Sequence, residues 1–536
     1  MKSRILFLLL ACCAGVAAQH EHAAGDPSQL GTVKFQISCR EGARAPFERG
    51  MALLHSFWYA ESEKAFAALA EKYPECAMAH WGVAMSITHP LWEVADKPSL
   101  RRGLDILQKA KAAATADERE RAYLAAIETF YRDYERLDHL TRLKAYEQAM
   151  QKLTERYPND DEAKMFYALS LLWTATASPP DKTYAKQKQA GALLETILPK
   201  YPQHPGLAHY IIHSYDFPPL AEQGLDAARR YAKIAPDVPH ALHMPSHIFT
   251  RLGMWDDSIA SNISSAAAGR KYNWPGEELH AMDYLVYAYL QQARDKEAQA
   301  IAGRMPAVKT GEPSAFAGFY ARAAIPARYV IETRRWKDAA QLEIPAGLFP
   351  GGRYAWTEAN FYFARALGGV HTEQLELAKQ CVEKLREQHA TLIEAGEKGW
   401  AEQVEIQRLT AAAWLAKAEG KKQEAVKLMM AAVDKEDATD KHPVTPGAIT
   451  PAGELLGEML LELGEPKLAL AAFEVVLAGA PNRFHALAGA GRAAQQAGDP
   501  QAARKYYGKL VEVCQKADTE RAELREARAL LATAAR

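Results

Sequence analysis

Four histidines in the middle of the chain have the side-chain type and the spacing of metal ligands. His209 and His213 form one pair, and His243 and His247 repeat it 34 residues further on. Residues four apart on a helix have Cβ atoms about 5–6 Å apart, so each pair would share one helix face. Two such pairs on neighbouring helices are one way in which helical proteins bind a metal ion. Imidazole nitrogens suit zinc or copper better than magnesium or calcium, so zinc or copper is the ion that this pattern predicts.

The same region offers further candidate ligands. His280 and Asp283 open the next predicted helix, where they would act as a ligand or as a hydrogen-bond acceptor behind one. The predicted metal set is therefore His209, His213, His243, His247, His280 and Asp283. No cofactor other than this ion is expected.

Two other roles fit these histidines, and we favour the first of them over a metal site. They would form hydrogen bonds to neighbouring helices or to a bound peptide, or they would transfer protons, since imidazole titrates near neutral pH. The chain contains no HExxH, CxxC or GxSxG string, so no enzyme class is indicated. The sequence favours a binding protein over an enzyme.

The elements that carry the histidines belong to a helical repeat. Helix-favouring residues dominate the composition, and β-branched residues are sparse. Pro202 and Pro236 end successive predicted helices and are again 34 residues apart. The clearest repetition is near the C-terminus, where one set of five residues recurs 34 positions later: Gly457, Gly464, Pro466, Ala469 and Phe473, then Gly491, Gly498, Pro500, Ala503 and Tyr507.

These repeats resemble tetratricopeptide (TPR) repeats, whose period is about 34 residues. Gly50, Phe66 and Pro74 stand where that family has a small residue, an aromatic residue and a terminating proline. The segments FERGMALLHSFWYAESEKAFAALAEKYPECAMAHWGVAMS and HALHMPSHIFTRLGMW are similar to a group of exported bacterial TPR proteins without an assigned reaction. The resemblance implies an all-α, TPR-like right-handed solenoid of stacked helical hairpins with an interaction role.

The resemblance also implies where the histidines face. In TPR proteins, certain positions of the first helix of each repeat line a concave ligand groove. Counted from Pro202 and Pro236, the histidine pairs fall at such positions. The implied groove residues are His209, His213, Asp216, His240, His243, His247 and Arg251. Pro245 lies inside the same predicted helix and is expected to kink it locally.

Two other segments each admit two interpretations. His55 and His89 lie among aromatic residues that form either a stacking platform for a peptide or sugar or, as we expect, the core of the N-terminal hairpins. The proline-rich segment 441–447 is either a rigid connector, which we favour, or a loop that folds over the groove.

The predicted organisation has six parts. They are a signal peptide (1–18), a linker (19–42), TPR-like repeats with the histidine-rich groove (43–335), irregular TPR-like helices and loops (336–448), regular TPR repeats (449–515) and a C-terminal capping helix (516–536).

The N-terminus predicts export. Lys2 and Arg4 precede a short apolar run that ends in small residues, as in a secretory signal peptide with cleavage after Ala18. The alternative, a lipoprotein signal at Cys12, fits less well. No later run is long enough to cross a membrane. We therefore expect a periplasmic or secreted protein.

The remaining cysteines and the charge complete the expectations. Cys39 and Cys76 flank the first hairpin and are the expected disulfide, whereas Cys381 and Cys514 sit in helical patterns as buried thiols. The net charge is −1, so no nucleic acid is expected as a partner. The first functional hypothesis is a scaffold that binds a peptide or protein segment in its groove. The second is a zinc or copper metalloprotein, and the oligomeric state stays open.

Overall fold

The computed structural model describes residues 27–91, 93–113, 116–309 and 315–533. Within these ranges the chain is helical and has no strand. The predicted signal peptide and the start of the predicted linker lie outside the described residues.

The helices follow one another with short connections. The N-terminal group comprises α1 (Arg44–His55), α2 (Tyr59–Lys72), α3 (Ala77–Ile87), α4 (Lys97–Ala112), α5 (Glu118–Tyr131), α6 (His139–Arg156), α7 (Asp161–Ala177) and α8 (Ala185–Ile197). The central group comprises α9 (Pro205–Tyr215), α10 (Leu225–Ile234), α11 (Pro239–His243), α12 (Pro245–Arg251), α13 (Trp255–Lys271), α14 (Pro275–Gln291), α15 (Asp295–Arg304) and α16 (Ala315–Glu332).

The C-terminal group comprises α17 (Trp336–Ala340), α18 (Trp356–His371), α19 (Leu375–Glu394), α20 (Lys398–Ala418), α21 (Lys422–Ala438), α22 (Ala452–Glu462), α23 (Pro466–Gly479), α24 (Phe484–Gln496), α25 (Pro500–Val513) and α26 (Ala522–Thr533). Short 3₁₀ turns η1 (Glu41–Ala43), η2 (Ala221–Gly224), η3 (Met305–Ala307) and η4 (Gly352–Tyr354) lie between helices.

The helices stack as a TPR-like solenoid, so the predicted all-α fold is confirmed. Nearly every helix packs against the next one along the chain, and contacts such as α16 with α18, α18 with α20 and α22 with α24 join successive hairpins. This arrangement buries apolar residues in a series of connected cores along the molecule.

Glycine and aromatic residues at repeat spacing make the hairpins fit. A Cβ added to Gly457 would lie 2.6 Å from the Phe473 ring, and one on Gly491 would lie 2.6 Å from the Tyr507 ring. Only glycine lets these rings pack so close to the neighbouring helix. The small residue and the aromatic residue of the repeat therefore do what the sequence pattern predicted.

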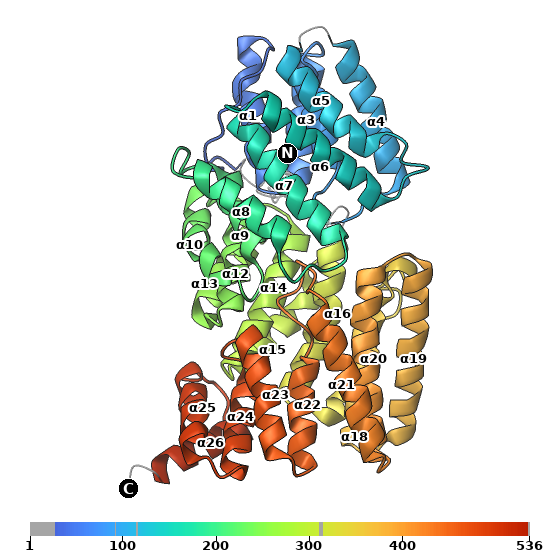
Figure 1. Ribbon diagram of the computed structural model, residues 1–536, viewed down its shortest axis with the longest axis vertical. Helices are drawn as coiled ribbons and strands as arrows, with labels where there is room; N and C mark the ends of the chain where they lie inside the picture. Colours follow the sequence, from blue (N-terminus) through green and yellow to red (C-terminus); the bar gives the residue numbers. More distant parts are fainter. Residues whose placement is uncertain (1–26, 92, 114–115, 310–314, 534–536) are drawn as a thin grey trace, which may run out of the picture.

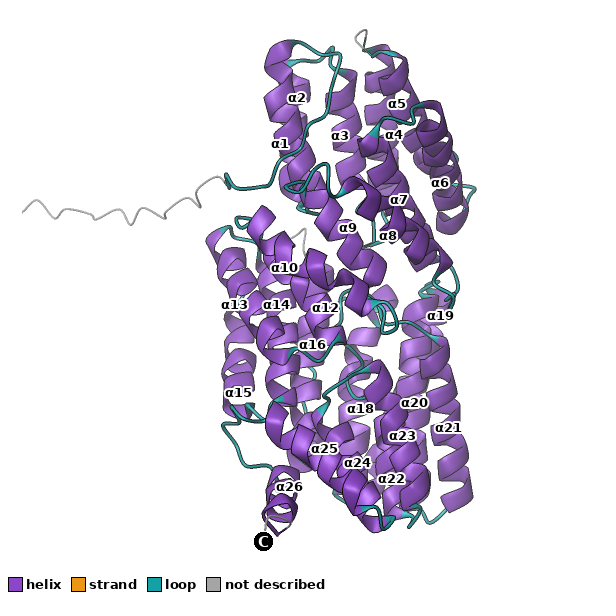
Figure 2. Ribbon diagram, turned by 60° about the vertical axis from the view of Figure 1, so that its left-hand side comes forward, coloured by secondary structure: helices purple, strands orange, loops and turns teal. Residues whose placement is uncertain are grey.

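The solenoid curls back on itself, which brings distant helices together (Figure 2). Helix α1 packs against α9. Farther along, the C-terminal repeats lie against the central helices: the buried Arg483 guanidinium donates to Glu454 and to Glu332, and Trp255 donates to the Asn482 carbonyl at 3.0 Å. Contacts of this kind set the surroundings of the central helices.

The described part of the predicted linker is irregular, as expected, but it is not a free tether. Leu30, Val33 and Phe35 are buried, and the Thr32 amide donates to the Gln203 carbonyl at 2.8 Å. The Phe35 ring packs on those of Phe47 and Tyr123, with centroids 5.2 Å and 5.5 Å away. These apolar side chains explain why the segment lies along the repeats.

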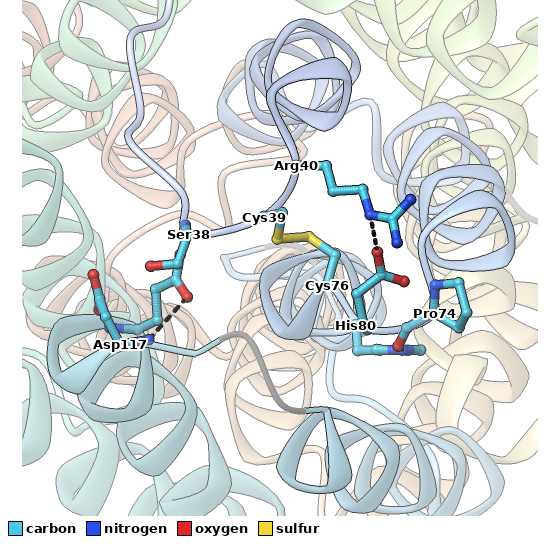
Figure 3. The surroundings of a disulfide bond; sticks show 9 residues. Ser38, Cys39, Arg40, Pro74, Cys76, His80 and Asp117 are labelled. Atoms are coloured by element: carbon cyan, nitrogen blue, oxygen red, sulfur yellow. Dashed lines mark hydrogen bonds and ion pairs between the residues drawn. A yellow bond between two sulfur atoms is a disulfide. The ribbon is translucent and has the colours of Figure 1, made fainter.

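Cys39 and Cys76 form the expected disulfide, which ties this segment to the start of α3 (Figure 3). Cys381 and Cys514 are buried free thiols, also as expected. Among the described residues, none of the helices has the length and apolar character needed to cross a bilayer.

The predicted kink at Pro245 is present as a break between two helices. α11 ends at His243 and α12 begins at Pro245, with Met244 between them. Across the break the His247 amide donates to the Met244 carbonyl at 3.1 Å. The break turns the chain between two of the candidate ligands.

Candidate metal centre

The predicted histidines gather in the interior of the central helices, on α9, α11, α12 and α14 (Figure 1). All are buried, and the most exposed of them, His213, keeps 7% of its surface. They form two adjoining groups of three, which are His243, His247 and His280 (the first triad) and His209, His213 and His240 (the second triad).

The open groove implied by the TPR resemblance is wrong for these side chains. Of the seven implied groove residues only Arg251 is half-buried, and the other six are buried: His209, His213, Asp216, His240, His243 and His247. Packing of α1 against α9 covers His209, whose ring bonds the His55 carbonyl. The repeat register therefore predicted which residues share a face but not that this face is enclosed.

In the first triad, the Nε2 atoms of His243 and His247 lie 3.0 Å apart. The His280 ring from α14 approaches them, with its centroid 4.1 Å from that of His243. One nitrogen from each of the three rings lies within 4.8 Å of the others. The rings of His243, His247 and His280 thus each bring one nitrogen to the same small region.

Hydrogen bonds at Nδ1 show where the two closest rings carry their hydrogens. The Asn262 side-chain nitrogen donates to the Ser258 carbonyl at 2.7 Å, so the Asn262 oxygen is the acceptor for His243 Nδ1, also at 2.7 Å. His247 Nδ1 donates to Asp216 Oδ2 at 2.8 Å. In the neutral rings both Nε2 atoms therefore present lone pairs to each other.

Asp216 is held as a carboxylate. Burial alone would raise its pKa, but Lys441 and Arg251 outweigh burial and keep the pKa well below its ordinary value. Lys441 Nζ lies 2.9 Å from Oδ2, and Arg251 Nε lies 2.9 Å from Oδ1. The ionised Asp216 therefore fixes the orientation of the His247 ring.

The rings themselves are held neutral. Burial lowers the pKa of His247 to about 4, against the opposing effect of Asp216. Burial, reinforced by the neighbouring rings of His280 and His247, places the pKa of His243 well below its ordinary value. A shared proton between the two Nε2 atoms is thus disfavoured near neutral pH.

The second triad has a related arrangement. His209 Nδ1 donates to the His55 carbonyl at 2.6 Å, and His240 Nδ1 donates to Glu277 Oε1 at 3.1 Å. His213 Nε2 lies 3.1 Å from His209 Nε2. The two triads adjoin, with ring centroids of His213 and His247 6.1 Å apart.

In a third buried group, formed by His55, Glu162 and His204, the carboxylate accepts a hydrogen bond from each ring. Nε2 of His55 donates to one Glu162 oxygen at 3.1 Å, and Nε2 of His204 donates to the other at 2.9 Å. His55 Nδ1 accepts from the Tyr210 hydroxyl at 2.9 Å. Burial would raise the pKa of Glu162, but the two histidines outweigh burial and lower the pKa. The ionised carboxylate therefore accepts the Nε2 hydrogens of both rings.

Asp283 does not join the histidines, which corrects its predicted role. It forms a buried ion pair with Arg328 from α16. Burial raises its pKa to about 6, with Arg328 opposing. Tyr284, one turn after His280 on α14, approaches the triad instead. Its hydroxyl lies 3.4 Å from His247 Nε2 and donates to the Thr445 carbonyl at 3.1 Å.

The segment 441–447 is more than a connector, contrary to the interpretation that we favoured. It belongs to the α21–α22 loop (residues 439–451), which runs beside α14 and α16 (Figure 1). Lys441 reaches Asp216, and the Tyr320 hydroxyl donates to Thr445 Oγ1 at 2.7 Å. The loop therefore closes over the first triad.

The aromatic residues near His55 are core, as expected. Phe57, Trp58 and Tyr59 are buried. The Phe57 ring packs against that of His209 with centroids 4.3 Å apart. These rings form one wall of the second triad.

Three hydrogen-bond partners of the histidines were missed in the sequence: Asn262, Glu277 and Glu162. Asn262 is part of a glycosylation-like string, yet it is fully buried behind His243. Glu277 lies 37 residues from His240, and Glu162 lies 107 residues from His55. A buried carboxylate or amide near a histidine has no signature at the TPR period, so repeat spacing could not identify them.

No family model matches the chain, and no curated protein does. Among solved structures it is similar to a chain of "Structure of Naa15/Naa10 bound to HypK-THB", with 13% identity over 92% of this chain and 80% of that chain and a TM-score of 0.25. Two structures of monomeric IFIT1 mutants, with Gppp-AAAA and with m7Gppp-AAAA, are 13% identical over 89% of this chain and 98% of theirs, with TM-scores of 0.37 and 0.38. Likeness at this level says nothing about what this chain binds.

Proposed function

We propose that this protein is a metal-binding helical solenoid that holds a zinc or copper ion at the first triad, through His243, His247 and His280. One observation carries the proposal. Two buried imidazoles face each other through Nε2 atoms 3.0 Å apart, while both Nδ1 atoms already donate elsewhere. Two lone pairs at that distance repel each other unless a cation lies between them.

The protonation of the two rings favours a metal ion over a shared proton, and the spacing is close to that of a metal-bound pair. Zinc–imidazole bonds are about 2.0–2.1 Å long, so two nitrogens on a tetrahedral ion would lie roughly 3.3 Å apart. A shared proton would require an imidazolium in a buried site, and burial lowers the pKa of both rings. Ligation by imidazoles alone selects zinc or copper over magnesium or calcium.

The surroundings match those of metal ligands in proteins. A ligating histidine usually donates its second nitrogen to a carboxylate or a carbonyl oxygen, which fixes the ring. Asp216 does this for His247, and the Asn262 side chain does it for His243. When bound, the ion would act as a Lewis acid, and three histidines would leave it a further coordination position.

Metal analysis of the full chain, purified without a histidine tag, tests the proposal. We expect zinc or copper in stoichiometric amounts, and its loss in a His243→Ala, His247→Ala double variant. His80→Ala is the matched control, since His80 lies outside the clusters and bonds the Pro74 carbonyl. Copper is distinguished from zinc by its electron paramagnetic resonance signal. Metal content that is unchanged in the double variant would refute the site.

A second candidate function is peptide binding, and a different region favours it. The C-terminal repeats enclose a cavity of about 380 Å³ lined by α22 and α24, together with Arg334 and His371. Arg334 pairs with Glu458, but its Nη1 has no hydrogen-bond partner among the described residues. A peptide carbonyl or carboxylate would satisfy that donor.

Peptides with a free or an amidated C-terminus test this second candidate. We expect the free form to bind more tightly, and Arg334→Ala to remove the difference. Equal binding of both forms by the wild-type protein would refute a role for Arg334.

We also propose that the protein works in the periplasm or outside the cell. The Cys39–Cys76 disulfide supports an oxidising compartment. Mass spectrometry of the protein recovered from periplasm and medium checks this, and recovery of the full-length chain from the cytoplasm alone would contradict it.

A further inference from the structure

The second triad resembles the first in its paired Nε2 atoms and in the acceptors behind its rings, but it is formed by other histidines. His209 and His213 come from α9, one repeat before His243 and His247, whereas His240 shares α11 with His243. One nitrogen from each of His209, His213 and His240 lies within 4.8 Å of the others. All are buried.

We propose that the second triad binds its own zinc or copper ion, so that the protein contains a two-metal centre. This proposal rests on the proposed function, because it assigns the same ligand chemistry to the neighbouring group. It adds a second site with three ligands of its own and one further ion per chain.

Two hydrogen bonds direct the nitrogens of this triad. His209 donates its Nδ1 hydrogen to the His55 carbonyl, and His240 donates its Nδ1 hydrogen to Glu277. In the neutral rings both Nε2 atoms therefore carry lone pairs. A carbonyl and a carboxylate behind two histidines are the partners that ligating imidazoles usually have.

His213 completes the set. Its Nε2 atom lies 3.1 Å from that of His209, close to the 3.0 Å between the paired nitrogens of the first triad. Both pairs are four residues apart in sequence, and in successive repeats this spacing brings the paired Nε2 atoms to similar separations. The repeated geometry supports a repeated ligand.

The two triads share one interior region. The ring centroids of His240 and His243 lie 5.9 Å apart, and those of His213 and His247 lie 6.1 Å apart. Each triad has its own carboxylate, Glu277 behind the second and Asp216 behind the first. Each ion would thus have a separate charged partner in the protein.

Metal counting on single variants of the full, untagged chain tests the second site. After loading with zinc and removal of excess, we expect two ions per wild-type chain, and one ion in either His240→Gln or His280→Gln. The double variant should hold none. His80→Gln should keep both.

A spectroscopic readout gives independent information on the second site. After loading with copper(II), each single variant should keep one copper signal with the line shape of the site it retains, and the double variant should give none. Circular dichroism checks that each variant is folded. If His240→Gln fails to fold, Glu277→Gln keeps every ring and should weaken the second ion roughly 10–100-fold.

The outcomes separate the two proposals. No ion in the wild-type protein refutes the proposed function and this site with it. One ion that is lost in His280→Gln and kept in His240→Gln overturns the second site alone. One ion that is lost in both variants shows a single shared site and also overturns the two-metal centre.

Discussion

Two buried histidine groups in this protein look alike in composition and burial, yet their hydrogen bonds differ. In the group of His55, Glu162 and His204, each ring donates to the carboxylate, and Tyr210 serves the remaining nitrogen of His55. In the first triad, His243 and His247 direct their hydrogens away from each other and their lone pairs together. In the first arrangement both Nε2 hydrogens have a carboxylate acceptor without an ion, whereas in the second two lone pairs face each other.

The comparison teaches that a cluster of buried histidines is not by itself a metal site. What matters is where each ring places its single hydrogen. When a partner behind the ring takes that hydrogen, the opposite nitrogen is left as a ligand. When a carboxylate lies between the rings, it accepts both hydrogens and the group is a structural network.

The same substitution in both groups should give the largest difference. We expect His247→Ala to lose the ion of the first triad and His55→Ala to keep it. The physical reason is that His247 supplies an Nε2 ligand, whereas His55 uses Nε2 for Glu162. Metal content per chain, measured by mass spectrometry, checks this, and equal losses in both variants would remove the distinction between the groups.

The stability of the metal-free protein should show the reverse order. His55→Ala leaves a buried oxygen of the Glu162 carboxylate without its donor, which costs at least about 1–3 kcal/mol. His247→Ala should cost less, because Asp216 keeps Lys441 and Arg251 and the lone-pair repulsion is relieved. Denaturant unfolding of chelator-treated protein measures both. A larger loss for His247→Ala would contradict the proton assignment.

Partners behind the ligands should have a smaller effect on affinity. Asn262→Ala removes the acceptor that holds His243 in place, so the ion should bind roughly 10–100-fold more weakly. Competition with a chromophoric chelator gives the dissociation constant. Asn273→Ala, at an asparagine outside the triad contacts described above, serves as the control, and an equal loss there would point to a general effect on folding.

The smallest effect should come from the α21–α22 loop. Lys441→Met removes its contact with Asp216 but leaves every ligand in place. We expect the same metal content and faster release of the ion to a chelator, by several-fold, because the loop covers the triad. Lys182→Met, at an exposed residue of the α7–α8 connection that bonds Asp440 of the loop, should release the ion at the wild-type rate. Identical rates in all three proteins would show that the loop does not limit release.

Local spacing predicted more of this molecule than long-range packing did. The 34-residue period and the glycine and aromatic positions predicted the stacked hairpins, and Gly457 and Phe473 make the expected contact. The i,i+4 spacing correctly brought His243 and His247 together. These features depend on one helix or two neighbouring helices, which is why sequence periodicity contains them.

The enclosure of the site depends on residues far apart in the chain. Lys441 reaches Asp216 from 225 residues away, and His209 bonds the His55 carbonyl from 154 residues away. Both contacts arise from the curl of the whole solenoid, which no repeat period encodes. Asp283 was assigned wrongly for a similar reason, because Arg328 arrives from α16, 45 residues further along the chain, and pairs with its carboxylate.

The proposed metal centre is tested most directly by the number of zinc or copper ions in the untagged protein and in its His243→Ala, His247→Ala variant. It predicts stoichiometric metal in the wild-type protein and the loss of at least one ion per chain in the variant. Wild-type protein that stays metal-free after loading with either ion, while folded and oxidised at Cys39–Cys76, would contradict it.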